Sequence, residues 1–331
     1  MQDKGSTGEL MIRAIAAALA LSLAVAPAAL AQSKRVAIAG WGPHPTLNES
    51  IEGFKKGLSE EGFSGAAVVF DETNVNFDAA LIPQMLTRLA GAQPDLMATV
   101  ATPVSAAARQ QLRARTFPVV AFPIADPVHA KLVPSWTAGD KLMTASSVAL
   151  DYPAVLDFFK TLLSGMRRLG VLFDTGDDSS KAALDGLEAA AAKAGITIVA
   201  VGVDNPNELP QRVQSAVGRV DVLFTVASGR IQQGMAAIAA TADRARLPVI
   251  TSIPQAVQQN YALAAFAVSF GQSGLAAGRI AGRILKGADA ASVPPYRAKA
   301  DEHKPIINSR KLEVLGLKLP PALAACNCVV N

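Results

Sequence analysis

The chain has 331 residues, 50% of them hydrophobic and 18% charged, so it is long enough to form two modest domains and too apolar to be disordered. The formal net charge of +4 is spread along the chain without a basic run, which argues against a nucleic-acid partner. Its two cysteines, Cys326 and Cys328, are too few for a disulfide framework. This CxC pair can bind a metal or form a strained disulfide, but we favour a frayed C-terminal tail without a role in the core.

The N-terminal region has the pattern of a secreted protein. Residues 14–31 are almost wholly apolar, follow Arg13, and end in the small-x-small sequence Ala-Leu-Ala. We therefore predict that residues 1–31 are a signal peptide. The alternative is a membrane anchor, since about 18 apolar residues can just cross a bilayer. Pro27 and the small-residue end favour cleavage over a membrane anchor. The residue after the cut is Gln32 rather than a cysteine, so no lipid anchor is expected. The protein is therefore predicted to be periplasmic.

The rest of the chain contains an internal repeat. The segment Arg-Val-Ala-Ile-Ala from Arg35 has a counterpart, Arg-Leu-Gly-Val-Leu, 133 residues later at Arg168. Later segments repeat as well: Ala-Gln-Pro-Asp-Leu-Met from Ala92 matches Gly-Arg-Val-Asp-Val-Leu from Gly218, and Phe117-Pro-Val-Val matches Leu247-Pro-Val-Ile. Each half therefore predicts the order strand, helix, strand, helix, strand, helix, strand.

The predicted strands and helices indicate an α/β fold. The strands are short, β-branched and apolar throughout, as strands buried on both faces are, and the helices are amphipathic. Alternation of strand and helix predicts parallel sheets with right-handed crossovers. We expect two similar Rossmann-like lobes with a ligand cleft between them, at the carboxyl ends of the strands. Pro83 is tolerable only near a helix start, so its helix is predicted to begin around Leu81 or to be kinked.

Motifs of catalysis are missing from the sequence. The glycines of Gly40-Trp41-Gly42 are not followed by the third glycine of a dinucleotide fingerprint, because Pro45 stands there. Neither a P-loop nor a nucleophile elbow occurs, and the three histidines show no metal spacing. We therefore predict that the chain is not an enzyme and needs neither a cofactor nor a metal.

The first cleft loop is predicted between Trp41 and Pro45. Thr46 and Glu49 fit a capping box, with Thr46 as the N-cap, so the helix would begin near Thr46. In that arrangement Trp41 and His44 can contact a ligand. The alternative for Trp41, given equal weight, is packing against its own lobe.

Two further loops of the first half can bind charged groups. Ala101 follows an apolar strand, Thr102 and Pro103 would be the N-cap and first residue of a helix, and Ser105 lies in its first turn. Free N–H groups at that helix start suit a carboxylate, although an ordinary capped helix is a substantial alternative. Asp126 can neutralise a ligand ammonium or fix its own turn, and we favour the turn slightly.

The equivalent loops of the second half are polar. They cover residues 174–180, 226–230 and 252–254. Arg230 is a possible partner for a ligand carboxylate, although a solvated surface arginine is commoner. The remaining candidate ligand-binding residues are Asp174, Ser179, Ser228, Ser252 and, further along, Ser269.

Several of these segments together resemble a known family. His44-Pro45-x-Leu47 followed by Gly53-Phe54-x-x-Gly57-Leu58-x-Glu60-x-Gly62-Phe63 is similar to the N-terminal signature of tryptophan/tyrosine-type substrate-binding proteins of ABC transporters. The resemblance continues to about residue 323, through Pro94-Asp95-Leu96, Ala101-Thr102-Pro103, Asp126-Pro127-Val128, Arg168-x-Gly170-Val171-Leu172, Ile284-Leu285-Lys286-Gly287-Ala288, Ile307-Asn308, Leu315-Gly316-Leu317 and Pro320.

The resemblance implies a type I periplasmic-binding-protein fold whose two lobes close around a solute. In that fold the chain crosses between the lobes three times, which we place near residues 143–145, 268–270 and 301. The N-terminal lobe would then contain residues 32–145 and 271–300, and the C-terminal lobe residues 146–270 and 301–331. A helix over 271–286 would return to the first lobe.

The sequence also departs from the family at positions near the cleft. Asn48 and Gly229 stand where the family commonly has Asp, Ala145 replaces a Gly, and Ser269-Phe270 replaces Asp-Tyr. The acidic positions could hold an α-ammonium, so their loss leaves the choice between an amino acid and an aromatic carboxylate open.

The functional prediction is an extracytoplasmic solute-binding protein. We expect it to act as a monomer, to capture an amino acid or related carboxylate, and to deliver it to an ABC transporter permease. One alternative is the ligand-binding component of a periplasmic sensor system. A transcription regulator of the same fold would need an N-terminal DNA-binding motif, and a secreted α/β enzyme would need a catalytic constellation.

Overall fold

The computed structural model describes residues 33–331. The predicted signal peptide and the alternative membrane anchor lie outside the described residues. Within residues 33–331, no helix has both the length and the apolar character that a membrane crossing requires.

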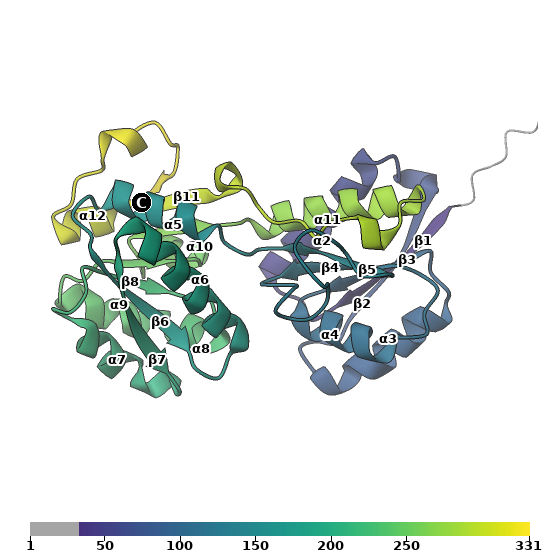
Figure 1. Ribbon diagram of the computed structural model, residues 1–331, viewed down its shortest axis with the longest axis horizontal. Helices are drawn as coiled ribbons and strands as arrows, with labels where there is room; N and C mark the ends of the chain where they lie inside the picture. The colour runs from purple at the N-terminus through teal and green to yellow at the C-terminus, as the bar shows by residue number, and fades with distance from the viewer. Residues whose placement is uncertain (1–32) are drawn as a thin grey trace, which may run out of the picture. The chain divides into compact units, whose positions relative to one another are not determined.

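The first lobe is built on a five-stranded parallel sheet (Figure 1). Strand β1 is an interior strand of this sheet because it pairs with β2 on one side and β3 on the other. The order across the sheet is β2 (Val68–Asn74), β1 (Lys34–Gly40), β3 (Leu96–Val100), β4 (Val119–Ile124) and β5 (Met143–Ser147). Its helices are α2 (Pro45–Glu60), α3 (Ile82–Gly91), α4 (Thr102–Gln111) and the returning α11 (Phe270–Leu285).

The second lobe has a seven-stranded sheet that is parallel except where β10 pairs with β11. Its order is β12 (Val329–Val330), β11 (Lys304–Asn308), β10 (Ala264–Ala267), β9 (Val249–Thr251), β8 (Val222–Thr225), β6 (Arg168–Asp174) and β7 (Thr197–Val203). Its helices are α5 (Tyr152–Leu162), α6 (Asp178–Ala194), α7 (Leu209–Ala216), α8 (Gly229–Gln233), α9 (Met235–Arg244), α10 (Pro254–Gln258) and α12 (Ser309–Leu315). The α/β class and the repeated order of strands and helices are confirmed.

The repeat extends to individual hydrogen bonds. Asp95, before β3, accepts from the backbone N–H of Arg35 at 2.8 Å and from Lys34 Nζ at 3.1 Å. Its counterpart Asp221, before β8, accepts from the backbone N–H groups of Arg167 and Arg168 at 2.9 and 2.8 Å. Each carboxylate therefore fixes the start of one central strand against the start of the next.

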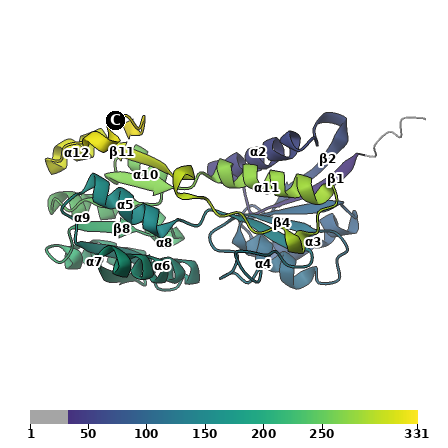
Figure 2. The ribbon, with the colours of Figure 1, turned by 45° about the horizontal axis from the view of Figure 1, so that its top comes forward.

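Helices α2 and α11 approach each other closely. They run side by side in both ribbon views (Figure 1 and Figure 2). A Cβ added to Gly57 would lie 2.2 Å from the carbonyl oxygen of Leu275, and one added to Gly274 would lie 1.9 Å from that of Ser50. These backbones can meet only because both helices present glycine at the contact. The contact places α11 against α2 of the first lobe.

The chain passes between the two sheets in three segments. Strand β5 continues through Ser147, so the first passage covers residues 148–151 and lies beyond the predicted 143–145. The second lies at 268–269, between β10 and α11, and the third follows Tyr296 and ends before β11. We propose the lobe boundaries at these passages, which moves the first one from 145 to after Ser147.

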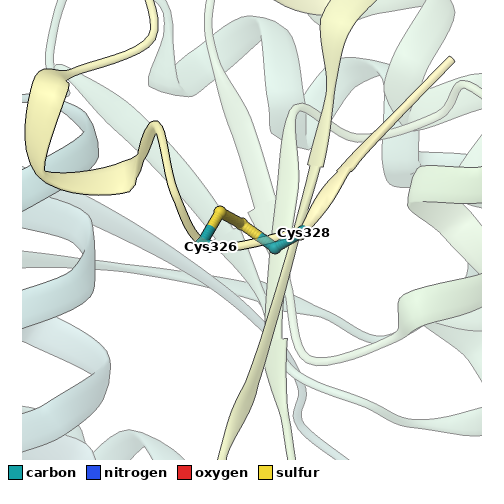
Figure 3. The surroundings of a disulfide bond; sticks show 2 residues. All are labelled: Cys326 and Cys328. Carbon is teal, nitrogen blue, oxygen red and sulfur yellow. A yellow bond between two sulfur atoms is a disulfide. The ribbon is translucent and has the colours of Figure 1, made fainter.

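The preferred interpretation of the C-terminus as a frayed tail is wrong. Cys326 and Cys328 form a disulfide (Figure 3), and Cys328 is only 6% exposed. Directly after it, β12 pairs with β11, where Ile307 N–H donates to the Cys328 carbonyl at 2.8 Å. The tail has a place in the core because it extends the second sheet by one strand.

Two predicted helix starts also need correction. His44, rather than Thr46, is the N-cap of α2, and its Nδ1 lies 2.8 Å from Thr46 Oγ1. Glu49 does not close a capping box, because its carboxylate accepts from Ser269 Oγ at 2.9 Å and from Gly271 N–H at 3.2 Å. Thr102 is the first residue of α4, and Ala101 is its N-cap. Helix α3 begins at Ile82, so Pro83 lies in its first turn as predicted.

Candidate functional site

A cavity of about 720 Å³ lies where the passages meet the strand ends. Its walls come from both lobes: the loop after β4, the passage at 148–150, helices α5 and α6, and the loops after β8, β9 and β10. This location agrees with the rule that open α/β sheets bind ligands beyond the carboxyl ends of their strands. Three predicted site residues line it, namely Asp126, Ser179 and Ser252.

One part of the cavity wall, which we call the polar mouth, brings together Asp126, Trp136, Tyr152 and Arg297. The guanidinium of Arg297 lies 5.0 Å from the centre of the Trp136 ring, in cation–π contact. Arg297 Nη2 also donates to the Leu150 carbonyl at 3.4 Å. The first and third passages and the loop after β4 therefore contribute to one surface.

Asp126 has one oxygen committed to its own loop. Its Oδ1 accepts from the backbone N–H groups of Val128 and His129, both at 2.9 Å. The turn-fixing role that we favoured is thereby confirmed. Among the described residues no group donates to Oδ2, and the residue is half-buried in the cavity wall. The same carboxylate can therefore hold its turn and receive a ligand cation.

Tyr152 supplies a neutral phenol to the mouth. Burial and, to a smaller extent, the nearby Asp126 carboxylate raise the pKa of Tyr152 to about 12, against the opposing effect of Arg297. Within the described residues its hydroxyl makes no hydrogen bond. The group therefore keeps its proton at physiological pH and can donate it to a ligand oxygen.

The rest of the cavity is a groove between α5 and α6. Its surface is formed mainly by small apolar residues, because α6 contributes alanines and a glycine and α5 contributes Leu156. The residues of this part are Pro153, Leu156, Ala182, Ala183, Gly186, Ala189, Ala190 and Ala194, with Asp157, Lys160 and Lys193 also lining it. Lys160 Nζ donates to the Ala194 carbonyl at 2.6 Å, which links the two helices at that end. A ligand with an apolar body can lie here while its charged groups stay at the mouth.

Trp41 and His44 do not line the cavity. Trp41 packs edge-on against Phe77, with ring centroids 6.0 Å apart and planes at 83°. It also contacts the cores on both faces of the first sheet. This is the alternative of packing on its own lobe, while His44 is exposed and caps α2.

The loop at Ala101 has an unusual backbone. Ala101 has φ 77° and ψ 156°, a region that only glycine adopts easily. Ser105 is fully buried, and its hydroxyl bonds to the Ala101 carbonyl and to Thr99 Oγ1, both at 2.9 Å. These bonds hold the strained turn. Thr102 and Pro103 form the first turn of α4 and lie outside the cavity, so an anion site there stays a prediction.

The other predicted residues of the second lobe serve its loops. Asp174 is 5% exposed, accepts from Gly176 N–H at 2.9 Å and pairs with Arg230. The guanidinium of Arg230 therefore binds a carboxylate of the protein, rather than standing free for the carboxylate of a ligand. Ser228 caps α8 and Ser269 caps α11 through their hydroxyls, and neither residue lines the cavity.

Sequence reasoning missed three of the four residues of the polar mouth, namely Trp136, Tyr152 and Arg297. A signal for two of them was present, because Tyr152 follows the first passage and Arg297 begins the third. Treating the passages as cavity walls would have found both. Trp136 lies in an irregular segment without periodicity, and only the fold places it against Arg297.

No group of three or more His, Cys, Asp or Glu side chains among residues 33–331 is arranged to hold a metal ion. The described part of the cavity therefore combines the carboxylate, guanidinium and phenol of the polar mouth with a mainly apolar groove that also contains Asp157, Lys160 and Lys193, and this is the chemistry of a binding site.

Comparison with known proteins decides the family. The model of the ABC transporter substrate binding protein family matches residues 35–328, which is nearly all of the described chain. The chain belongs to the ABC transporter substrate-binding protein family. This substrate-binding protein is 27% identical over 288 residues to a tyrosine-binding protein of Clostridioides difficile strain R20291, covering 87% of this chain and 82% of that one.

Solved structures agree with this assignment. A ligand-free, open substrate-binding protein with adhesive properties from Clostridium difficile has a TM-score of 0.78 and 26% identity, covering 90% of this chain and 99% of that one. An ABC domain from Streptococcus pneumoniae in complex with L-Trp has a TM-score of 0.75 and 24% identity, covering 90% and 100%. The substrate-binding protein therefore has the type I periplasmic-binding-protein fold, as the resemblance implied.

Proposed function

We propose that this substrate-binding protein captures an amino acid with an aromatic or other apolar side chain and delivers it to the permease of an ABC transporter. It would do so outside the cytoplasm, as a monomer released from its signal peptide into the periplasm. The observation that carries the proposal is the polar mouth, where a carboxylate, a guanidinium and a neutral phenol line one cavity together with a mainly apolar groove.

Each group of the mouth fits one part of such a ligand. Asp126 Oδ2 suits an α-ammonium, while Arg297 and the neutral phenol of Tyr152 suit a carboxylate. Trp136 and the alanine-lined groove suit an apolar side chain. Asp126 thus offers the negative charge that the sequence lacks at the family's acidic positions. The tyrosine-binding relative supports the same class of ligand.

A matched ligand series tests this assignment. L-tyrosine and L-tryptophan are compared by calorimetry and thermal shift with the corresponding arylpropionates, which lack the ammonium, and with tyramine and tryptamine, which lack the carboxylate. We expect only the intact amino acids to bind tightly. A ligand at about 100 times its dissociation constant raises the free energy of unfolding by about 2.7 kcal/mol, which is readily detected.

The other results are informative as well. Preference for the arylpropionates would replace the amino acid by an aromatic carboxylate and exclude the role proposed for Asp126. Binding of none of these ligands would contradict the proposed solute class. Delivery to a permease is tested by ligand-stimulated ATP hydrolysis of the transporter in vesicles, and its absence with a well-bound ligand would favour the sensor alternative.

A further inference from the structure

A second cavity, which we call the basic pocket, lies away from the ligand cavity. It has a volume of about 510 Å³ and shares no lining residue with the first. It lies between the second half of α4 with the turn that follows and the segment 130–142, which leads to the start of β5. This is the edge of the first sheet where β5 begins, whereas the ligand cavity lies where the strands end.

The lining of the basic pocket is strongly cationic. Its charged residues are Arg109, Arg113, Arg115, Lys131 and Lys141 against a single carboxylate, Asp140. This local excess of four positive charges equals the formal net charge of the whole chain, +4. The concentration of charge in one concavity makes the local potential far more positive than the average over the surface.

The one carboxylate is already used by the protein. Asp140 Oδ2 pairs with Arg109, and Oδ1 accepts from the Lys141 backbone N–H at 2.8 Å. The Arg109 hydrogen bond is the main reason why the pKa of Asp140 lies below its usual range. Asp140 therefore stays ionised but neutralises only one of the five cations.

Arg115 is held in place without a counter-ion. Its Nη1 donates to the Leu112 carbonyl at 2.9 Å and its Nη2 to the Leu142 carbonyl at 3.0 Å. Its buried Nε has no acceptor among the described residues. Burial lowers the pKa of Arg115, and repulsion from Arg109 lowers it further. The pocket thus presents a fixed positive charge that is held by two backbone carbonyls and makes no direct ion pair, although the nearby Asp140 carboxylate favours it.

The outer part of the pocket is available to a ligand. Arg113, Lys131 and Lys141 are exposed, and none of them makes an ion pair within residues 33–331. Guanidinium groups match phosphate oxygens in geometry, and lysines add charge to the same anion.

We propose that the basic pocket binds a phosphate-bearing polyanion, either a free phosphate compound or the phosphate headgroup of an anionic lipid. The two sources share one chemistry, and the test separates them. This inference goes beyond solute capture and does not depend on it.

The test uses inorganic pyrophosphate in calorimetry and vesicles of phosphatidylglycerol or phosphatidylcholine in a sedimentation assay. The purified protein is compared with the double variant R113E/K131E, in which both altered side chains are exposed, and with K56E/K318E. That control changes the net charge equally at exposed lysines outside the pocket. A milder variant, R113Q/K131Q, guards against a general effect of the added acidic groups, and melting curves verify folding.

We expect pyrophosphate affinity to fall about tenfold or more in R113E/K131E and less than about twofold in K56E/K318E, with weaker binding at higher salt. Loss of phosphatidylglycerol-vesicle binding in the pocket variant alone, with no pyrophosphate binding, would support the lipid headgroup. Equal loss in both double variants, or binding of neither pyrophosphate nor vesicles by the unaltered protein, would overturn the proposal. Amino-acid binding in R113E/K131E is measured separately, so failure of the solute assignment would not be mistaken for failure of this one.

Discussion

At the scale of single residues, Asp126 serves the protein and its proposed ligand with different oxygens. Oδ1 holds the turn through two backbone N–H groups, while Oδ2 of this cavity-lining residue has no donor among residues 33–331. Asp126 can therefore both fix its turn and neutralise a ligand ammonium, the two roles that the sequence left open.

The variant D126N tests the ligand role. The amide oxygen can still accept from Val128 and His129, so we expect a small change in the melting temperature of the unliganded protein. The lost charge should weaken binding of an amino acid by about tenfold, or about 1.4 kcal/mol, in calorimetry. D157N removes a carboxylate from the groove away from the mouth and should leave affinity within about twofold. Equal effects of the two variants would contradict the assignment.

Ala101 gives a residue-scale prediction about stability. Its φ of 77° and ψ of 156° cost an L-residue about 1–3 kcal/mol relative to glycine. We therefore expect A101G to leave stability unchanged or to raise the free energy of unfolding by about 1 kcal/mol in urea titrations. The matched control A107G, inside α4, should lower it by about 1 kcal/mol. A clear loss of stability in A101G would show that Ala101 is not strained.

At the scale of elements, the crossing of α2 and α11 is the most sensitive contact in the first lobe. The glycine methylene carbons of one helix lie against carbonyl oxygens of the other. Glu49 adds to this contact at the start of α11, where its carboxylate accepts from Gly271 N–H. The crossing therefore anchors α11 directly beside the second passage.

The variant G274A should separate the two helices. Its Cβ would lie 1.9 Å from the Ser50 carbonyl oxygen, which is backbone and cannot move aside easily. We expect a loss of about 2–4 kcal/mol in the free energy of unfolding, measured by urea titration. G91A, at the end of α3 where no atom lies within 4 Å of the added Cβ, is the control and should be neutral or slightly stabilising. Similar behaviour of the two variants would rule out the tight crossing.

At the scale of the whole molecule, the duplicated carboxylates Asp95 and Asp221 make the stability of both sheets depend on pH. Backbone hydrogen bonds and neighbouring cations lower the pKa of each, against the effect of burial. Each carboxylate has a lower pKa in the folded protein than in the unfolded chain, where it is near 3.8. Its contribution to the free energy of unfolding is therefore complete above the unfolded-state pKa and is lost as the pH falls through the folded-state pKa.

We therefore expect the melting temperature to fall as the pH drops below about 4. The double variant D95N/D221N should be less stable than the unaltered protein at pH 7 and should show a flatter acid limb in calorimetric scans. E188Q, at an exposed position of α6, should retain the steep limb. Parallel acid limbs in all three proteins would mean that other carboxylates govern acid unfolding.

The sequence was sufficient for the repeat, the order of strands and helices, and the family. These features depend on local patterns, because a buried strand needs a continuous apolar run and an amphipathic helix needs its period. The missing capping box of α2 is explained by a tertiary contact, whereas the start of α4 differs because Ala101 adopts an unusual backbone conformation. Glu49 fits a capping box locally, yet the start of α11 competes successfully for its carboxylate.

Only the tertiary structure decided which side chains form the ligand cavity and what the C-terminal tail does. Trp136, Tyr152 and Arg297 come from three separate segments of the chain and meet because the first and third passages lie beside the segment between β4 and β5. Likewise, Cys328 is buried because β11 offers an unpaired edge to the last residues. Periodicity reports only which face of an element is buried, whereas a binding site depends on how separate elements are placed against one another.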